Sequence, residues 1–140
     1  MIASCYSYFN NKNDIAIAYK ILKKAESMID ISTRILDLHF LYQIKIEIYY
    51  KNRDNDPEGI NKAILACQQQ IEISPKSRIA FKKEYKDSPL PRHIGFEQLA
   101  IIYEKQKHFT KAIEISQEAL KQGWNGDWEK RIGRCKKKLN

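Results

Sequence analysis

Apolar residues recur at steps of three and four along almost the whole chain, and this spacing restricts the fold more than any other feature. Two of these stripes consist of Ile15, Ala18, Ile21, Leu22 and Ala25, and of Ile60, Ala63, Ile64, Cys67 and Ile71. Such a period places the apolar side chains on one face of an α-helix. Five glycines and four prolines in 140 residues are too few for a fold of many short strands. The sequence therefore predicts an all-α fold.

The breaks between the stripes predict where the helices begin and end. Helices are expected over about residues 2–9, 15–25, 34–51, 58–73, 75–87, 92–106, 110–122 and 127–138. Side chains that could cap a helix N-terminus stand at Asp14, at Ser32 or Thr33, at Thr110 and at Asp127. Pro57 suits a first helical turn, and Gly123 suits a helix end. One alternative stays open, because residues 44–48 alternate between apolar and polar as a strand does.

A hairpin of two helices with specific spacing occupies about residues 92–124. Its pattern consists of Phe96, Leu99, Ala100 and Tyr103 on the first helix, and Ala112, Ser116 and Ala119 on the second. This pattern resembles the tetratricopeptide repeat, in which Trp, Leu, Gly and Tyr precede Ala and Phe, and a Pro closes the unit. Small residues at 100, 112 and 119 let the two helices approach closely, and aromatic residues at 96, 103 and 109 fill the spaces between hairpins. Ala100 replaces the usual Gly, Ser116 replaces Phe, and Trp124 lies near the position of Pro.

The same template fits two earlier segments less closely. The matches are Phe9, Ala18, Leu22 and Ala25 in residues 1–31, and Tyr42, Tyr49, Ala63, Cys67 and Pro75 in residues 37–75. Tyr49 and Ala63 are 14 residues apart instead of nine, so residues 52–58 are interpreted as an insertion. The resemblance implies one domain over residues 1–140, a short right-handed superhelix of antiparallel hairpins closed by a capping helix at 127–139. An unrelated stack of helical hairpins is the alternative.

The chain is basic, with 25 Lys and Arg against 17 Asp and Glu and a formal charge of +8. Residues 1–70 have an excess of one positive charge, whereas residues 71–140 have an excess of seven. The excess lies in residues 76–92 and 130–140. The candidate basic patch is Lys82, Lys83, Lys86, Arg131, Arg134, Lys136 and Lys137. Because these cations attract carboxylates and phosphates alike, an acidic protein and a nucleic acid are both open as partners.

No group of residues has the spacing of a catalytic, metal or cofactor site. The sequence lacks the usual signatures of phosphate-binding loops, activated nucleophiles and zinc ligands. Cys5, Cys67 and Cys135 lie more than sixty residues apart, which is typical of small buried residues in a reducing cytoplasm. No apolar run approaches the length of about 18 residues that suggests a membrane span. We therefore expect a cytoplasmic protein that has no enzymatic activity, uses no metal or cofactor and does not enter a membrane.

In the tetratricopeptide family, the first helices of successive hairpins line a concave groove that binds proteins or peptides. In the register given above, the groove residues are Gln43, Glu47, Tyr50, Ile94, Glu97, Gln98 and Lys105. The resemblance thus implies a non-catalytic scaffold or adaptor that binds a protein or peptide, and an acidic partner would meet the basic second half. The alternative is a basic accessory protein that associates with nucleic acid. Self-association is a further option if the helix expected at 2–9 leaves an apolar face uncovered.

Overall fold

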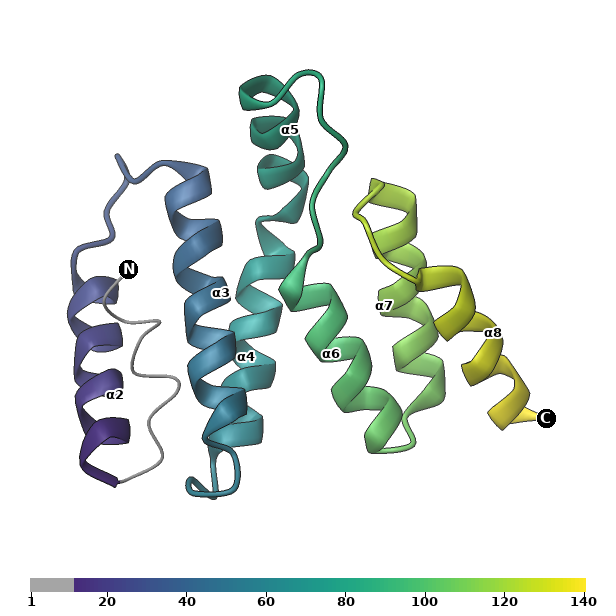
Figure 1. The fold of residues 1–140 in the computed structure, drawn as a ribbon, viewed down its shortest axis with the longest axis horizontal. Coiled ribbons are helices and arrows are strands. Elements are labelled where there is room, and N and C mark those ends of the chain that lie inside the picture. Colours follow the sequence, from purple (N-terminus) through teal and green to yellow (C-terminus); the bar gives the residue numbers. More distant parts are fainter. Residues whose placement is uncertain (1–11) are drawn as a thin grey trace. The chain divides into compact units, whose positions relative to one another are not determined.

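The computed structural model describes residues 12–140, and every regular element in that part of the chain is an α-helix (Figure 1). The helices are α2 (Lys12–Ser27), α3 (Ile35–Lys51), α4 (Gly59–Glu72), α5 (Ser74–Glu84), α6 (Ile94–Lys105), α7 (Phe109–Gln122) and α8 (Trp128–Leu139). Residues 44–48 belong to α3, so the all-α prediction is confirmed and the strand alternative is wrong. The helix expected at 2–9, the repeat match at Phe9 and the expected burial of Cys5 lie outside the described residues.

The chain divides into two compact units, residues 1–70 (unit 1) and residues 71–140 (unit 2). The boundary lies in the last turn of α4, and it coincides with the step in charge along the sequence. Unit 1 therefore carries an excess of one positive charge and unit 2 an excess of seven. The two units are described separately below.

In unit 1, the best-defined contact between helices is an apolar cluster between α2 and α3. It consists of Ala18, Leu22, Ile44 and Ile48, with Tyr19, Leu41 and Tyr49 packed against it. The predicted stripe of α2 is thus the buried one, and Ala63 and Cys67 of the α4 stripe are also fully buried. Burial raises the pKa of the Cys67 thiol to about 12, so this sulfur stays protonated and packs as a small apolar group.

Lys45 explains why part of α3 alternates like a strand. Its side chain is only 7% exposed, although it lies between Ile44 and Ile46 in the sequence. The ammonium donates to Glu26 of α2 at 3.0 Å and to Gln69 of α4 at 2.7 Å. A buried charge of this kind contributes little net stability, but removing one partner would leave the other uncompensated. We infer that the pair specifies how the helices of unit 1 align.

The predicted insertion at residues 52–58 is an ordered turn held to the helices of unit 1. The Asp56 carboxylate accepts the Tyr19 hydroxyl at 2.8 Å and the Lys62 ammonium at 2.9 Å. Hydrogen bonding from Lys62, with Tyr19 contributing, holds the pKa of Asp56 below its ordinary value. The same carboxylate accepts the backbone N–H of Glu58, just before α4 begins. Pro57 consequently lies in the turn before α4, not in its first helical turn as predicted.

The ring of His39 in unit 1 is almost completely buried, and this burial lowers its pKa to about 4. In the unfolded chain a histidine binds a proton near pH 6.5, so protonation favours unfolding as the pH falls from about 6.5 towards 4. Between pH 7 and pH 5 the chain is expected to lose about 2 kcal/mol of stability through this residue. The carboxylates of Asp56 and Glu104 have lowered pKa values, so their contribution is lost only in more acidic solution.

The measurement is urea unfolding, followed by circular dichroism, of the wild type and the His39→Phe variant at several pH values. Phenylalanine keeps a planar ring but cannot bind a proton. The variant should show a flatter dependence of stability on pH between 7 and 5, whatever its stability at pH 7. Equal slopes would mean that His39 is not the group that titrates.

The core of unit 2 follows the predicted hairpin closely. Its fully or almost fully buried residues include Phe96, Leu99, Ala100, Ala112, Ser116 and Ala119. A second cluster joins α7 to α8 through Ala112, Ile113, Ile132 and Cys135, with Tyr103 and Phe109 packed against it. The small residues at 100, 112 and 119 are therefore part of the buried core, as predicted. The apolar stripe of α8 packs back onto the unit, as expected for a terminal helix.

Most of the capping predictions are wrong, although the helix positions are nearly right. Asp14 lies inside the first turn of α2, because this helix begins at Lys12. The N-cap of α3 is Arg34, since Ser32 and Thr33 both hydrogen bond to Asp30 instead. Thr110 lies within α7, whose N-cap is His108. Asp127 does occupy the N-cap position of α8, but its side chain makes no capping hydrogen bond.

At the helix ends of unit 2, the prediction for Gly123 is confirmed, whereas the cap at His93 was not predicted. Gly123 ends α7 with a φ of 88°, in the left-handed region that favours glycine. His93 caps α6 by accepting the backbone N–H of Phe96 on Nδ1 at 3.1 Å. On α5, Phe81 is buried, whereas Ile79 and the C-cap residue Tyr85 are largely exposed.

Candidate functional site

Helices α6 and α8 begin at the same end of unit 2 and run in the same direction, with α7 antiparallel between them (Figure 1). The segments that precede the two helices are joined by a bridge between Arg92 and Asn125. In this bridge the backbone N–H of Asn125 donates to the carbonyl of Pro91 at 3.1 Å. The first turns of α6 and α8 are therefore held close together, and a surface shared by the two helices begins here.

A polar hollow of about 410 Å³ lies at this shared end. It is lined by Arg92, Glu97, Asn125, Gly126, Asp127, Trp128 and Arg131. Arg92 makes a two-point ion pair with Glu97, with N–O distances of 2.6 and 3.0 Å. Trp128 is almost fully buried and donates its indole N–H to the carbonyl of Trp124 at 2.8 Å. The hollow thus has a fixed aromatic wall and charged groups at its mouth.

Glu104, in the last turn of α6, connects this helix to α8. Its carboxylate accepts from Arg131 at 2.7 Å and from Arg134 at 2.6 and 2.9 Å. The hydrogen bonds from Arg134, joined by those from Arg131, hold the pKa of Glu104 below its ordinary value. The carboxylate is only 20% exposed, so this contact is better shielded from water than a typical surface ion pair. Glu104 therefore fixes α8 beside α6.

A second hollow of about 430 Å³ lies towards the opposite ends of α6 and α8. Its lining consists of Ile101, Glu104, Lys105, Lys107, Phe109, Arg131 and Lys138. Arg131 lines both hollows, so we treat them as one surface, the α6–α8 groove, defined by the lining of the two hollows together with Arg134. In the second hollow the cations outnumber the single carboxylate, which already binds Arg131 and Arg134.

Lys107 reaches this groove from a backbone conformation that is unusual for its residue type. Its φ is 62°, and the backbone N–H of His108 donates to the carbonyl of Tyr103 at 2.8 Å, which closes α6. α7 ends with the same kind of turn, but there a glycine, Gly123, takes the left-handed position. The left-handed conformation costs roughly 1 kcal/mol for a residue with a Cβ. A lysine at this position is thus conformationally unfavourable, and its side chain lines the second hollow.

The structure brings together some of the predicted site residues and leaves others apart. Glu97, Lys105 and Arg131 line the groove, and Arg134 joins it through Glu104. Ile94 and Gln98 are half-buried on α6 and line neither hollow. The other predicted groove residues, Gln43, Glu47 and Tyr50, belong to α3 of unit 1.

On α3, these three residues make contacts of their own. The Gln43 amide donates to Glu47 at 3.2 Å, and the Arg53 guanidinium lies over the Tyr50 ring at 4.1 Å. These are two separate local contacts on unit 1, which is described by itself.

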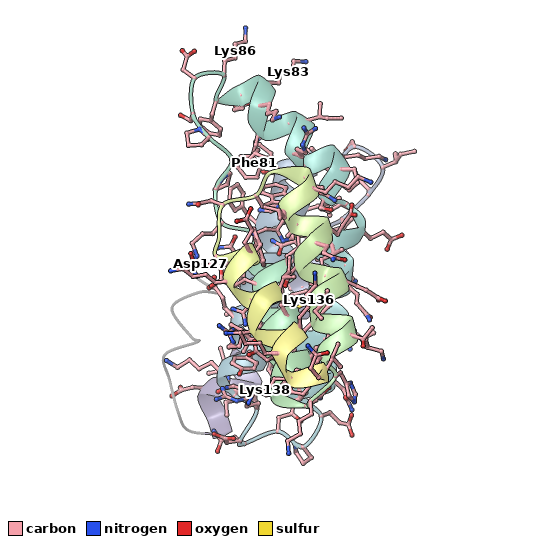
Figure 2. All side chains as sticks on the ribbon, turned by 90° about the vertical axis from the view of Figure 1, so that its right-hand side faces the viewer. Phe81, Lys83, Lys86, Asp127, Lys136 and Lys138 are labelled. Atoms are coloured by element: carbon pink, nitrogen blue, oxygen red, sulfur yellow. The ribbon has the colours of Figure 1, made fainter. Side chains whose placement is uncertain are left out.

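The candidate basic patch is divided between two ends of unit 2. Figure 2 shows Lys83 and Lys86 projecting at the end where α5 terminates, whereas Lys138 lies near the other end, with Lys136 on the α8 ribbon. Lys82 is adjacent to Lys83 in the last turn of α5, and Lys137 lies in the last turn of α8. The basic residues of α5 and those of α8 thus belong to two separate surfaces.

Several groove residues were not identified from the sequence. They are Arg92, Ile101, Glu104, Lys107, Phe109, Asn125, Gly126, Asp127, Trp128 and Lys138. One signal was available, because residue 101 lies four residues after 97, and residues 104 and 105 lie three and four residues after 101, so all share one face of α6. The partner helix could not be found in this way, since Arg131 and Arg134 lie 27 and 30 residues beyond Glu104.

Nowhere among residues 12–140 do three His, Cys, Asp or Glu side chains gather in a way that could hold a metal ion. No helix in that range combines the length and the apolar character needed to cross a bilayer. Burial raises the pKa of the Cys135 thiol, as it does for Cys67, which disfavours the reactive thiolate form of both.

Comparison with known proteins gives no relative from which a function could be transferred: no family model, no curated protein and no solved structure matches the chain.

Proposed function

We propose that the protein is a non-catalytic adaptor of the tetratricopeptide type, and that its α6–α8 groove binds an acidic segment of a partner protein. The observation that carries the proposal is the charge of the second hollow. Lys105, Lys107 and Lys138 surround it, while its one carboxylate, Glu104, is already engaged by two arginines. A carboxylate of a partner would find complementary charge there and a partly apolar wall beside it.

The family assignment is supported by where the helices of unit 2 approach one another. The positions that are small in the repeat, Ala100, Ala112 and Ala119, are fully buried, and Phe96 fills the aromatic position before them. In the family, first helices of successive hairpins line the binding groove. α6 and α8 have that relation to α7, and they are the two helices that line the hollows. The resemblance to the family and the position of the α6–α8 groove thus support the same proposal.

A protein partner is favoured over a nucleic acid by the way charges are distributed. A nucleic-acid backbone presents a continuous row of phosphates and is best matched by a continuous row of cations. In the groove the cations alternate with Glu97, Glu104 and Asp127, and the α5 lysines lie at the other end of the unit. An acidic peptide tolerates such interruptions because its carboxylates can be spaced to avoid them.

The experiment compares a fluorescein-labelled peptide rich in Glu and Ala with a labelled DNA duplex and a labelled RNA strand, by fluorescence anisotropy during a salt titration. We expect the full-length protein to bind the peptide at low salt and to bind it more weakly as NaCl is raised. Binding of the nucleic acids that is tighter than peptide binding at every salt concentration, with a steep salt dependence, would favour the nucleic-acid alternative. Absence of peptide binding even at the lowest salt would refute the proposed function.

A further inference from the structure

The chain that follows α5 folds back over the end of the helix and makes a second, different surface in unit 2. The backbone N–H of Tyr85 donates to Phe81 and that of Ser88 to Tyr85, so the chain turns immediately after the helix. Phe81 is almost fully buried, and its ring packs edge-on against Trp124, with ring centres 5.8 Å apart. Arg78 donates to the carbonyl of Gln122 at 2.7 Å, which also ties α5 to the end of α7. The tip of α5 is therefore a fixed part of the unit.

This turn encloses an apolar hollow of about 240 Å³. It is lined by Phe81, Tyr85, Ser88, Pro89, Leu90 and Pro91. Ser88 is the one residue of this lining with an aliphatic hydroxyl, and Leu90 is almost fully buried. Tyr85 is 54% exposed and so presents an aromatic face at the rim. Pockets for drug-sized molecules usually measure about 300–1,000 Å³, so this hollow suits a single large apolar side chain.

Three lysines lie in the segment that forms one side of the hollow. Lys82 and Lys83 lie in the last turn of α5, and Lys86 follows the helix; all three are exposed. Figure 2 shows Lys83 and Lys86 extending into solvent at this end, above Phe81. Glu84 and Asp87 are the acidic residues of this segment, so cations remain in excess. Lysines in a last helical turn also stabilise the helix dipole, but Lys86 lies beyond the helix and has no such role.

We propose that this α5-tip surface, the hollow together with Lys82, Lys83 and Lys86, binds a partner-protein segment in which one large apolar side chain is flanked by Asp or Glu. The apolar side chain fills the hollow against Tyr85 and Leu90, and the flanking carboxylates approach the lysines. A nucleobase is a poorer occupant, because its polar edges need hydrogen-bond partners that the proline and leucine walls do not supply. The surface shares no lining residue with the α6–α8 groove, so it is a second site and does not depend on the proposed function.

The test uses two labelled peptides of the same charge, one with Phe between glutamates and one with Gly in place of Phe, against the full-length protein. The Phe peptide should bind at least about 10-fold more tightly, because burying a large apolar side chain contributes about 1.5–3 kcal/mol. Tyr85→Ala should remove most of this difference and leave binding of the Gly peptide almost unchanged. Tyr85 is largely exposed, so the variant should keep the fold, which circular dichroism verifies.

Charge is tested separately with Lys82→Glu/Lys83→Glu, compared with Lys136→Glu/Lys137→Glu, which makes the same change in charge on exposed residues of α8. The α5 variant should weaken binding of the Phe peptide several-fold more than the α8 variant does. Equal binding of the two peptides to the wild type, or equal effects of the two double variants, would overturn the proposal. Displacement of the Phe peptide by a DNA or RNA strand at equimolar concentration would also overturn it, in favour of a nucleic-acid site.

Discussion

Gly59→Ala is expected to lower the free energy of unfolding by about 3 kcal/mol, at the upper end of what overpacking usually costs. A Cβ at this position would lie 2.7 Å from the Cα of Arg53 and 3.3 Å from the carbonyl oxygen of Tyr49. Both are backbone atoms, so no side chain can rotate away to make room. The turn at residues 52–58 would have to move, and with it the contacts of Asp56 to Tyr19 and Lys62.

Gly133→Ala is the matched control, because it makes the same chemical change at a helical glycine with open space around it. Nothing lies within 4 Å of a Cβ added at Gly133, which is exposed on α8. Alanine is the better helix former there, so this variant should be stabilised by about 0.5–1 kcal/mol. Urea unfolding followed by circular dichroism measures both changes. A Gly59→Ala protein as stable as Gly133→Ala would mean that the turn does not pack as closely as described.

The helices were predictable because their signal is local. The spacing of apolar residues along about four turns decides which face is buried, and that face needs no knowledge of its partner. Gly123 was predictable for the same reason, since a left-handed residue after a helix nearly requires glycine. The buried alanines at 100, 112 and 119 followed from a pattern with fixed spacings.

The caps and the buried charge were not predictable, because they depend on competing contacts. Ser32 and Thr33 can cap α3 in principle, but the Ser32 hydroxyl donates to the Asp30 carboxylate, and the Thr33 hydroxyl accepts the backbone N–H of Asp30. From the sequence, Lys45 would be expected to face solvent. Its burial is explained by its partners Glu26 and Gln69, which lie 19 and 24 residues away in the sequence. The spacing of apolar residues carries no information about contacts between residues so far apart in the sequence.

The candidate site could be predicted only in part, because the sequence pattern shows the face of a single helix but not the contacts between distant residues. The prediction of Glu97 and Lys105 was possible from their position on one face of α6. The prediction of Arg131 and Arg134 was possible from the basic composition of α8. That these residues form one groove depends on α8 lying beside α6, which Glu104 secures through contacts far apart in sequence. Lys107 joins them because it adopts the left-handed conformation, which a lysine rarely does.

The lysines of the α6–α8 groove provide the strongest test of the proposed function. Lys105→Glu/Lys107→Glu/Lys138→Glu is expected to weaken binding of the Glu- and Ala-rich peptide by about 30- to 100-fold. Each reversal replaces an exposed attraction of about 0.2–1 kcal/mol with a repulsion of similar size. The control Lys23→Glu/Lys76→Glu/Lys121→Glu makes the same change in net charge at exposed lysines outside the groove. It should weaken binding only a few-fold, and equal losses in the two variants would mean that only net charge matters.

Glu104→Gln should strengthen binding of the peptide. This variant distinguishes binding in the α6–α8 groove from attraction to the net charge of the surface. The substitution removes the one carboxylate of the second hollow and leaves Arg131 and Arg134 with only a neutral amide oxygen as their shared acceptor. The peptide carboxylate can then pair with the two arginines, whose charge the neutral amide no longer balances, so binding at low salt should tighten several-fold, although α8 is held less firmly. Anisotropy gives the affinity, and circular dichroism verifies that the helix content is kept. If a folded Glu104→Gln protein binds the peptide no better than the wild type, the arginines are not part of the binding surface. The assignment of the α6–α8 groove as the binding site would then be wrong.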